Sequence, residues 1–153
     1  MMMESTNSDA FIPTKGDVFE VLKELNGSSV AVDYQNKIVK VEWDGIVDLA
    51  TVNIILNKAA DLIEVGHCDK LLLNRKNLKE FTTEARIWIK QDLLRNRAKK
   101  LVNKVVKVAT VNSSTAMGGV FANFISTAIK LIFPKLSMVK FSSQQEGLDW
   151  LLS

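Results

Sequence analysis

Near the start of the chain, apolar and polar positions alternate in short runs before the pattern changes to a helical period. Apolar side chains recur at every second position in Ser29–Asp33 and Lys37–Trp43, with a turn at Gln35-Asn36 between the two runs. An earlier run, Phe19–Leu25, ends at Asn26-Gly27, a dipeptide suited to the positive φ of a tight turn. The pattern predicts three antiparallel strands.

A helix is expected after this sheet segment, which we predict to end at Gly45. Asp48 is placed to cap the helix, and Gly66 lies beyond its expected end at about Val65. The next apolar run, Leu71–Leu73, predicts a strand reached by a right-handed crossover. The apolar positions that recur at helical spacing are Leu49, Val52, Leu56, Ala59 and Ile63.

The second half of the chain continues with helices and strands in alternation. Such alternation is typical of a largely parallel sheet covered by helices. We therefore predict the α/β class: a mixed sheet opened by an antiparallel hairpin and continued by β-α-β crossovers, with helices packed on the sheet. The elements expected after Leu73 are a polar loop, a helix capped by Thr82 or Thr83 and running to about Leu101, a strand over Val105–Val111, an apolar helix over Ala116–Phe133 capped by Ser114 or Thr115, a strand over Ser137–Phe141, and a short terminal helix beginning with the capping box Ser143–Glu146.

Length and composition favour one ordinary globular domain. The polar residues 1–16 show no sustained period, so we expect a flexible lead-in before a single domain over residues 17–153. Cys68 is the one cysteine of the chain, which excludes an internal disulfide and favours a reducing compartment. The start of the chain lacks the features of a signal peptide, and Ala116–Phe133 falls short of the ~20 residues that a membrane span requires. We expect a cytoplasmic protein.

Four stretches carry the motifs of a known family: the hairpin Lys37–Asp44 with Trp43 before Gly45, the apolar strand before Asn74-Arg75, the segment Phe81–Ile89, and the terminal segment Phe141–Leu151. With the order of elements, they resemble the STAS superfamily, in particular its bacterial SpoIIAA-like branch, over about residues 17–152. The resemblance implies a small cytoplasmic interaction or ligand-binding domain that uses no cofactor.

The start of the second predicted helix departs from the pattern of phospho-switched STAS proteins. In those proteins a serine at this place, in an Asp-Ser-Ser-Gly-type turn, controls binding to a partner kinase. The resemblance implies Thr82 or Thr83 as the phosphate acceptor, and a helix N-terminus would stabilise the added charge. However, the glycine is absent and Glu84 would repel a phosphate. We interpret one threonine as an N-cap and expect no phosphorylation.

A dense polar cluster lies near the carboxyl end of the predicted strand Leu71–Leu73. Open α/β sheets bind ligands beyond such strand ends, which makes the cluster a candidate site. Glu84 and Arg86, however, lie two positions apart on a helix and point in different directions. We favour a polar surface loop over a binding site. The candidate binding residues are Asn74, Arg75, Asn77, Thr82, Thr83, Glu84 and Arg86.

The sequence offers no recognisable set of catalytic or metal-binding residues. His67 and Cys68 cannot fill a zinc site by themselves, and adjacent residues entering a strand face apart. We interpret them as a helix-end histidine and a small buried cysteine. No Gly-x-Ser-x-Gly turn occurs, and Gly118-Gly119 lacks the lysine and spacing of a phosphate-binding loop. We therefore expect no metal, no cofactor and no enzymatic activity.

Basic residues are concentrated in one window, although the net charge is only +3. The window either attracts an acidic partner, a phosphate or an anionic lipid, or forms the solvated face of a helix. We favour the helix face and expect no nucleic-acid binding, because no aromatic residues interleave with the basic ones from Arg95 onward. Against the single acid Asp92, the window holds Arg86, Lys90, Arg95, Arg97, Lys99, Lys100, Lys104 and Lys107.

The predicted third helix is apolar on more faces than packing on a sheet requires. A second subunit, a lipid, a binding partner or the terminal helix with Trp150 and Leu151 would cover the surplus. Our hypothesis is a non-enzymatic binding module, with homodimerisation as a plausible state. The alternative is a carrier of a small apolar ligand or lipid, which a cavity of ~300 Å³ or more beneath the helix would favour. The interface candidates are Met117, Phe121, Phe124 and Ile125.

Overall fold

The computed structural model describes residues 18–112, 127–131 and 133–153, and in these ranges the strands form one six-stranded sheet. The strands are β2 (Glu20–Leu25), β3 (Ser28–Asp33), β4 (Ile38–Val47), β5 (Lys70–Phe81), β6 (Lys107–Val111) and β7 (Ser137–Phe141). The helices are α1 (Leu49–Glu64), α2 (Thr83–Trp88) and α4 (Gln144–Leu151), and α2 continues into a π-helical segment, η3 (Ile89–Leu94), and a 3-10 segment, η4 (Arg97–Leu101).

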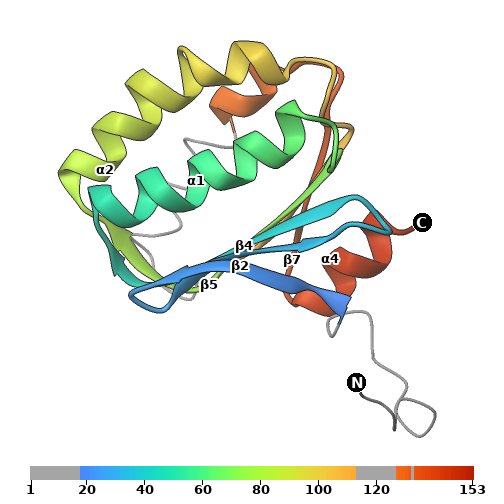
Figure 1. Ribbon diagram of the computed structural model, residues 1–153, viewed down its shortest axis with the longest axis horizontal. Helices are drawn as coiled ribbons and strands as arrows, with labels where there is room; N and C mark the ends of the chain where they lie inside the picture. The colour runs from blue at the N-terminus through green and yellow to red at the C-terminus, as the bar shows by residue number, and fades with distance from the viewer. Residues whose placement is uncertain (1–17, 113–126, 132) are drawn as a thin grey trace, which may run out of the picture.

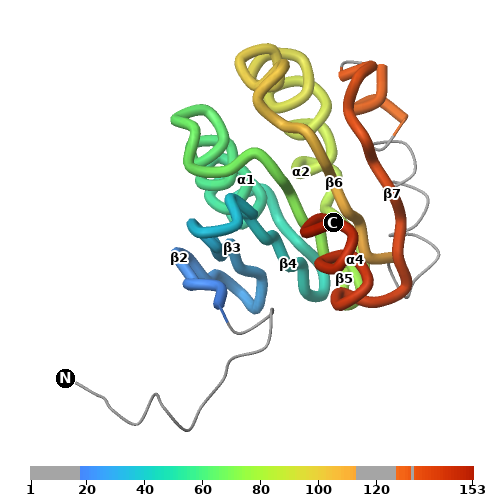
Figure 2. Tube along the Cα trace, turned by 90° about the vertical axis from the view of Figure 1, so that its right-hand side faces the viewer, coloured from blue at the N-terminus to red at the C-terminus, as the bar shows by residue number. Residues whose placement is uncertain are grey.

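The strands lie side by side in the order in which they occur along the chain. β2, β3 and β4 are antiparallel, and β4, β5, β6 and β7 are parallel. α1 and α2 lie over one face of this sheet, and α4 lies on the other (Figure 1). Figure 2 shows the strands in sequence with α4 in front of β5 and β6. The predicted α/β architecture, with a mixed sheet opened by an antiparallel hairpin, is confirmed.

The first turn follows its sequence signal closely. Asn26 and Gly27 have φ of 54° and 88°, the left-handed values that a two-residue hairpin turn requires. A Cβ atom at Gly27 would lie 2.6 Å from the Asp44 carboxylate, so the close approach of the chain also requires glycine here. The predicted turn between β2 and β3 is confirmed.

β4 and β5 are both longer than predicted. β4 continues past Gly45 to Val47, and β5 pairs with it in parallel as far as Phe81. The register shifts twice along this pair, and Gly45 has φ of 68°. The predicted end of the sheet at Gly45 and the predicted polar loop after Leu73 are therefore wrong. The reason is that irregular pairing between distant backbones interrupts the alternation by which a strand is recognised.

α1 begins and ends where its sequence signals indicated. The Asp48 carboxylate accepts a hydrogen bond from the Thr51 N–H at 3.0 Å, and Gly66 follows the helix with φ of 89°. Its buried side chains, such as Val52 and Ile55, pack in the core that α1 and α2 share with the sheet. The predicted cap is confirmed.

The segment after α2 explains why the predicted helix to Leu101 is only partly right. Its buried positions are Ala85, Ile89, Leu94 and Ala98. The step from Ile89 to Leu94 is one residue longer than the steps on either side. A π-helical turn, with more residues per turn than an α-helix, keeps both side chains on the buried face. The spacing of the buried apolar residues therefore favours a π-helical segment here over a regular α-helix.

α4 packs against the face of the sheet opposite α1. It begins at Ser143, whose Oγ accepts from the Glu146 N–H at 3.2 Å, which confirms the predicted cap. Gly147 lets α4 approach closely, because a Cβ there would lie 3.2 Å from Leu72 Cδ1. The second core on this face contains Ile38, Leu72, Ala109, Val111, Leu148 and Leu151.

The terminal helix does not cover the described part of the predicted third helix. Residues 127–131 are helical, and Ile129 packs with the core on the α1 side of the sheet, away from α4. The strand predicted over Val105–Val111 begins at Lys107. No helix among the described residues is long and apolar enough to cross a membrane. Outside the described residues lie the predicted lead-in 1–16, the caps Ser114 and Thr115, and the interface candidates Met117, Phe121, Phe124 and Ile125.

Candidate functional site

The predicted polar cluster is divided between the two faces of β5. Asn74 lies on the α4 face, where its Nδ2 donates to Gln144 Oε1 at 2.9 Å and to Glu42 Oε2 at 3.5 Å. Its Oδ1 accepts from the Lys76 N–H at 3.0 Å. Asn74 therefore fixes the start of α4 against the sheet, which gives it a structural role.

Arg75 lies on the opposite face and is almost completely buried, with 7% of its surface exposed. Asn74 pairs with Glu42 and Asn77 pairs with Asp44, so Arg75 lies in a bulge opposite the buried Trp43. Bulges of this kind redirect a side chain. The interpretation of the cluster as a surface loop is wrong at Arg75, because pairing with β4 makes this segment a strand.

The Nε of Arg75 is buried and forms no hydrogen bond with the described residues. Burial lowers the pKa of Arg75 from its ordinary value, and no acidic neighbour offsets this effect within the described ranges. A buried cation without a counter-charge is unusual, because removal of a charge from water is costly.

Thr110 is a second buried polar side chain that finds no partner. It is 1% exposed, and its Oγ1 forms no hydrogen bond with the part of the chain that the structure describes. Thr110 pairs with Leu73, the residue two positions before Arg75 on β5. The sequence analysis missed Thr110, although it is the one hydroxyl in the apolar run Val105–Val111.

The remaining candidates lie at the start of α2 or, for Asn77, on β5. Thr82 Oγ1 accepts from the Ala85 N–H at 3.2 Å, so the N-cap interpretation is confirmed for Thr82. Arg86 turns back toward the helix start, donating from Nη2 to Thr83 Oγ1 at 3.2 Å and from Nη1 to the Phe81 carbonyl at 2.8 Å. Thr83 and Glu84 are exposed, as is Asn77 on β5.

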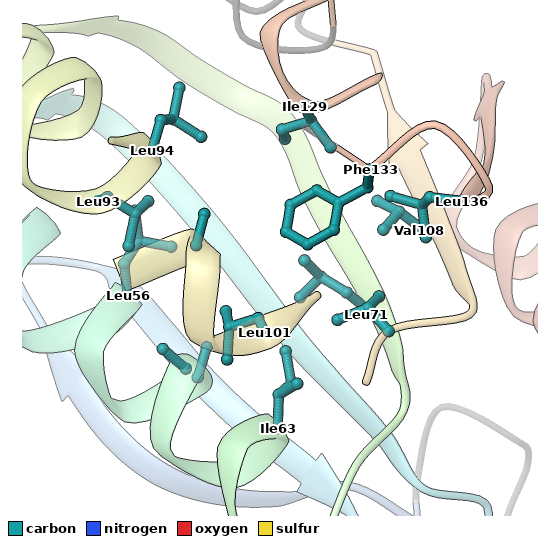
Figure 3. A pocket seen from close by; sticks show the side chains of 14 residues that line it. Leu56, Ile63, Leu71, Leu93, Leu94, Leu101, Val108, Ile129, Phe133 and Leu136 are labelled. Carbon is teal, nitrogen blue, oxygen red and sulfur yellow. The ribbon is translucent and has the colours of Figure 1, made fainter. Parts of the chain in front are cut away.

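A small apolar cavity lies between α1, η3, β5 and residues 129–136 (Figure 3). Its volume is about 100 Å³, and its lining side chains are aliphatic or aromatic. In Figure 3, Phe133 and Ile129 lie across the cavity from Leu56 and Leu93. A pocket for a drug-sized ligand usually measures at least ~300 Å³. By itself this cavity is smaller than such a pocket, and an adjoining hollow of about 320 Å³ shares Val105, Phe133 and Leu136 with it.

His67 and Cys68 have the structural roles that the sequence indicated. Cys68 is buried, and burial, with a smaller contribution from Asp69, raises the pKa of its thiol to about 11. The thiol is therefore protonated near neutral pH. His67 is exposed, with its ring edge-on to Tyr34 at a centroid distance of 5.6 Å. In the described ranges, no three His, Cys, Asp or Glu side chains are grouped so that they could hold a metal ion.

Several residues of the basic window stabilise the fold. Arg97 donates to Asp61 Oδ1 at 2.5 Å and to Glu64 Oε1 at 3.1 Å, which ties η4 to α1. Lys104 Nζ donates to the Glu64 carbonyl at 2.9 Å, and Lys107 Nζ donates to the Trp150 carbonyl at 3.1 Å. These contacts favour the structural interpretation of the window at these positions.

Comparisons with known proteins support the fold. No known protein family matches the sequence, and no curated protein does. The anti-sigma factor antagonist SpoIIAA in its unphosphorylated form is 16% identical, with a TM-score of 0.52 over 87% of this chain and 96% of that chain. The Bacillus cell fate determinant SpoIIAA in its phosphorylated form is 19% identical, with a TM-score of 0.52 over 87% of this chain and 98% of that chain.

An uncharacterized protein from Shewanella loihica with a SpoIIAA-like fold is also similar. It is 13% identical, with a TM-score of 0.50 over 87% of this chain and 91% of that chain. This chain therefore has a SpoIIAA-like fold, as its resemblance to the STAS superfamily implied. Identities this low establish the fold alone.

Proposed function

We propose that this chain is a non-enzymatic interaction module of the bacterial cytoplasm that binds a protein partner through the exposed start of α2. The observation that carries the proposal is the SpoIIAA-like fold, which extends over 87% of the chain. The matching SpoIIAA is named for its action on another protein, as an anti-sigma factor antagonist. The partner and the process differ between proteins of one fold, so the surface must supply the specific argument.

The exposed side of α2 has the composition of a partner-binding surface. Ile87 is 45% exposed, one helical turn after Thr83, so the two side chains share one side of the helix. Glu84 and Arg86 add one charge of each sign beside them. An exposed apolar side chain with polar neighbours is suited to reversible binding, because burial of Ile87 favours association and the polar groups give specificity.

The small volume of the wholly apolar cavity supports this proposal over the carrier, since the larger hollow beside it is partly polar. A carrier would enclose most of its ligand, and about 100 Å³ does not accommodate a lipid chain with its surroundings. The cavity is better explained as imperfect packing where η3, α1 and residues 129–136 meet above the sheet.

Site-specific photocrosslinking in cells tests the proposed surface. A photoreactive amino acid at Glu84 is expected to give a discrete crosslinked adduct with a second protein. The matched control places the same amino acid at Gln145, an exposed residue at the start of α4 on the other face of the sheet. We expect Ile87→Asp to abolish the adduct from position 84 while the circular dichroism spectrum stays unchanged.

Two results would contradict the proposed surface. The first is an adduct of equal yield from position 145, which would place the partner elsewhere or indicate non-specific capture. The second is the absence of any adduct from position 84 in cells that express the folded protein.

A further inference from the structure

The face of the sheet beneath α1 and α2 contains two buried polar groups that nothing in the described chain satisfies. These are the Nε of Arg75 on β5 and the hydroxyl of Thr110 on β6. Arg75 is 7% exposed and Thr110 is 1% exposed, so water does not readily replace a protein partner. Native proteins satisfy nearly all such groups, and each exception calls for an explanation.

The two side chains belong to one local site. Thr110 pairs with Leu73, and side chains of paired residues in parallel strands project from the same face. Arg75 follows Leu73 on that face. Strand spacing and rise per residue put the Cα atoms of Arg75 and Thr110 about 8 Å apart, within reach of a long arginine side chain. Both residues lie near the carboxyl end of β6, whose last pair with β5 joins Val111 and Asn74.

Among the described residues, no acidic neighbour offsets the burial of Arg75. No aspartate or glutamate occurs in the sequence between Asp92 and Glu146, a range that includes all of β6 and β7. On the neighbouring strand β4, Glu42 contacts Asn74 on the α4 face and forms an ion pair with Lys40 at 3.2 Å. Asp44 is exposed. The described residues therefore supply no negative charge that pairs with Arg75.

We propose that Arg75 and Thr110 bind a small oxyanion, a phosphate or carboxylate group, where the middle of β5 passes the carboxyl end of β6. The planar guanidinium donates two parallel hydrogen bonds to such a group, and the Thr110 hydroxyl donates a third. Open α/β sheets bind ligands at the carboxyl ends of their strands, and Thr110 lies one residue before the end of β6. Because both residues are buried, the site can admit a small anionic group but not the surface of a macromolecule.

Thermal unfolding of the purified protein tests this proposal at fixed pH and ionic strength. Potassium phosphate or potassium acetate replaces potassium chloride in a concentration series. A bound anion is expected to raise the unfolding midpoint of the wild type progressively, because it binds the folded state alone. A rise with phosphate only identifies a phosphate site, and a rise with both anions identifies the shared oxyanion chemistry.

Three variants distinguish anion binding at this site from a general electrostatic effect of the added salt. Arg75→Met is expected to abolish the rise, and Thr110→Val, which keeps the shape but removes the hydroxyl, to weaken the apparent affinity about tenfold. Lys76→Met is the matched control: it removes one positive charge from the exposed neighbour of Arg75 and is expected to keep the full rise. In chloride alone, Arg75→Met should unfold at or above the wild-type midpoint, and phosphate should reverse this order.

An equal rise in the wild type and in Arg75→Met would overturn the proposal, as would a wild type that responds to neither anion. If Arg75→Met does not fold, Arg75→Lys takes its place in the test. This variant keeps the positive charge but loses the paired N–H donors of the planar guanidinium, so it should bind the anion more weakly. A titration of phosphate followed by phosphorus NMR measures the same affinities directly. The test needs no partner protein, so its failure leaves the proposed surface of α2 unaffected, and the reverse also holds.

Discussion

Trp43 is a buried aromatic residue of the core on the α1 face. It lies on β4 with 4% of its surface exposed, and its ring meets that of Phe81 edge-on at 5.3 Å and 82°. Phe81 is the last residue of β5, immediately before the cap of α2. The aromatic pair therefore fixes the end of β5 against β4, and through it the position at which α2 begins.

Replacement of this ring should strongly destabilise the protein. Trp43→Ala is expected to lower the free energy of unfolding by about 3–5 kcal/mol, because a buried aromatic side chain leaves a cavity. The matched control is Tyr34→Ala, at an aromatic residue that is 49% exposed, with an expected change below about 1 kcal/mol. Urea unfolding measures both variants. Equal midpoints for Trp43→Ala and Tyr34→Ala would show that the Trp43 ring does not support the core.

At the scale of elements, α1, α2 and α4 each begin with a side chain that accepts a hydrogen bond from a free backbone N–H. Asp48 caps α1, Thr82 caps α2 and Ser143 caps α4. Such caps are local interactions, since the side chain and the N–H that it binds lie within three residues of each other. They fix where a helix starts without reference to the rest of the fold.

The cap of α1 predicts a pH dependence. The hydrogen bond from the Thr51 N–H lowers the pKa of Asp48 below its ordinary value of 3.8. A lowered pKa in the folded state contributes stability above the unfolded-state pKa, and this contribution is lost as the pH falls through the folded-state pKa. The stability difference between the wild type and Asp48→Asn, measured by urea unfolding, should be constant near neutral pH and shrink below about pH 4. A difference that does not change with pH would contradict the charged cap.

The N-cap of α2 is the basis for predicting that its threonines are not phosphorylated. The Thr82 hydroxyl already binds the Ala85 N–H, and Glu84 lies beside Thr83. We predict that incubation with native lysate and ATP leaves both threonines unmodified, as measured by mass spectrometry. Thr82→Ala and Thr83→Ala variants assign any signal to its position. Stoichiometric phosphate on either threonine would refute this prediction and support a phosphorylation switch.

At the scale of the whole molecule, the sheet separates two cores of different size. α1, α2 and η3 cover the larger core, and α4 covers the smaller one, which is centred on Leu72 and Ala109. The central parallel strands are buried on both faces, as is usual where crossover helices and a terminal helix enclose a sheet. The proposed partner surface and the proposed anion site both lie on the side of α1 and α2, which leaves α4 as a convenient site for control substitutions.

Self-association is a prediction from the sequence over residues 116–133. In a two-fold contact each changed residue acts twice, so one charge in an apolar interface should disrupt it strongly. We expect the wild type to sediment as a dimer at tens of micromolar, and Phe124→Glu or Ile125→Glu to sediment as a monomer with unchanged circular dichroism. A wild type that is already monomeric would exclude the dimer.

Only part of the candidate site could be predicted from the sequence. The sequence indicated Arg75 as a candidate because it belongs to a polar cluster near the carboxyl end of a central strand, and we interpreted that cluster as a surface loop. The burial of Arg75 depends on the bulge opposite Trp43, which the pairing with β4 creates. Thr110 was not predicted as a candidate, because the hydroxyl of a threonine in a strand usually forms a hydrogen bond with the backbone. That this hydroxyl has no such partner is visible only in the packed structure.

The sequence by itself determined what depends on neighbouring residues: the turn at Asn26-Gly27, the caps of the helices, and the alternation of strands and helices that defines an α/β sheet. Each of these follows from hydrogen bonds or steric limits within a few residues. Only the tertiary structure decided what depends on distant partners. The extension of β5 to Phe81 and the choice of sheet face for α4 follow from pairing and packing between segments far apart in the chain, whose free energy no local pattern contains.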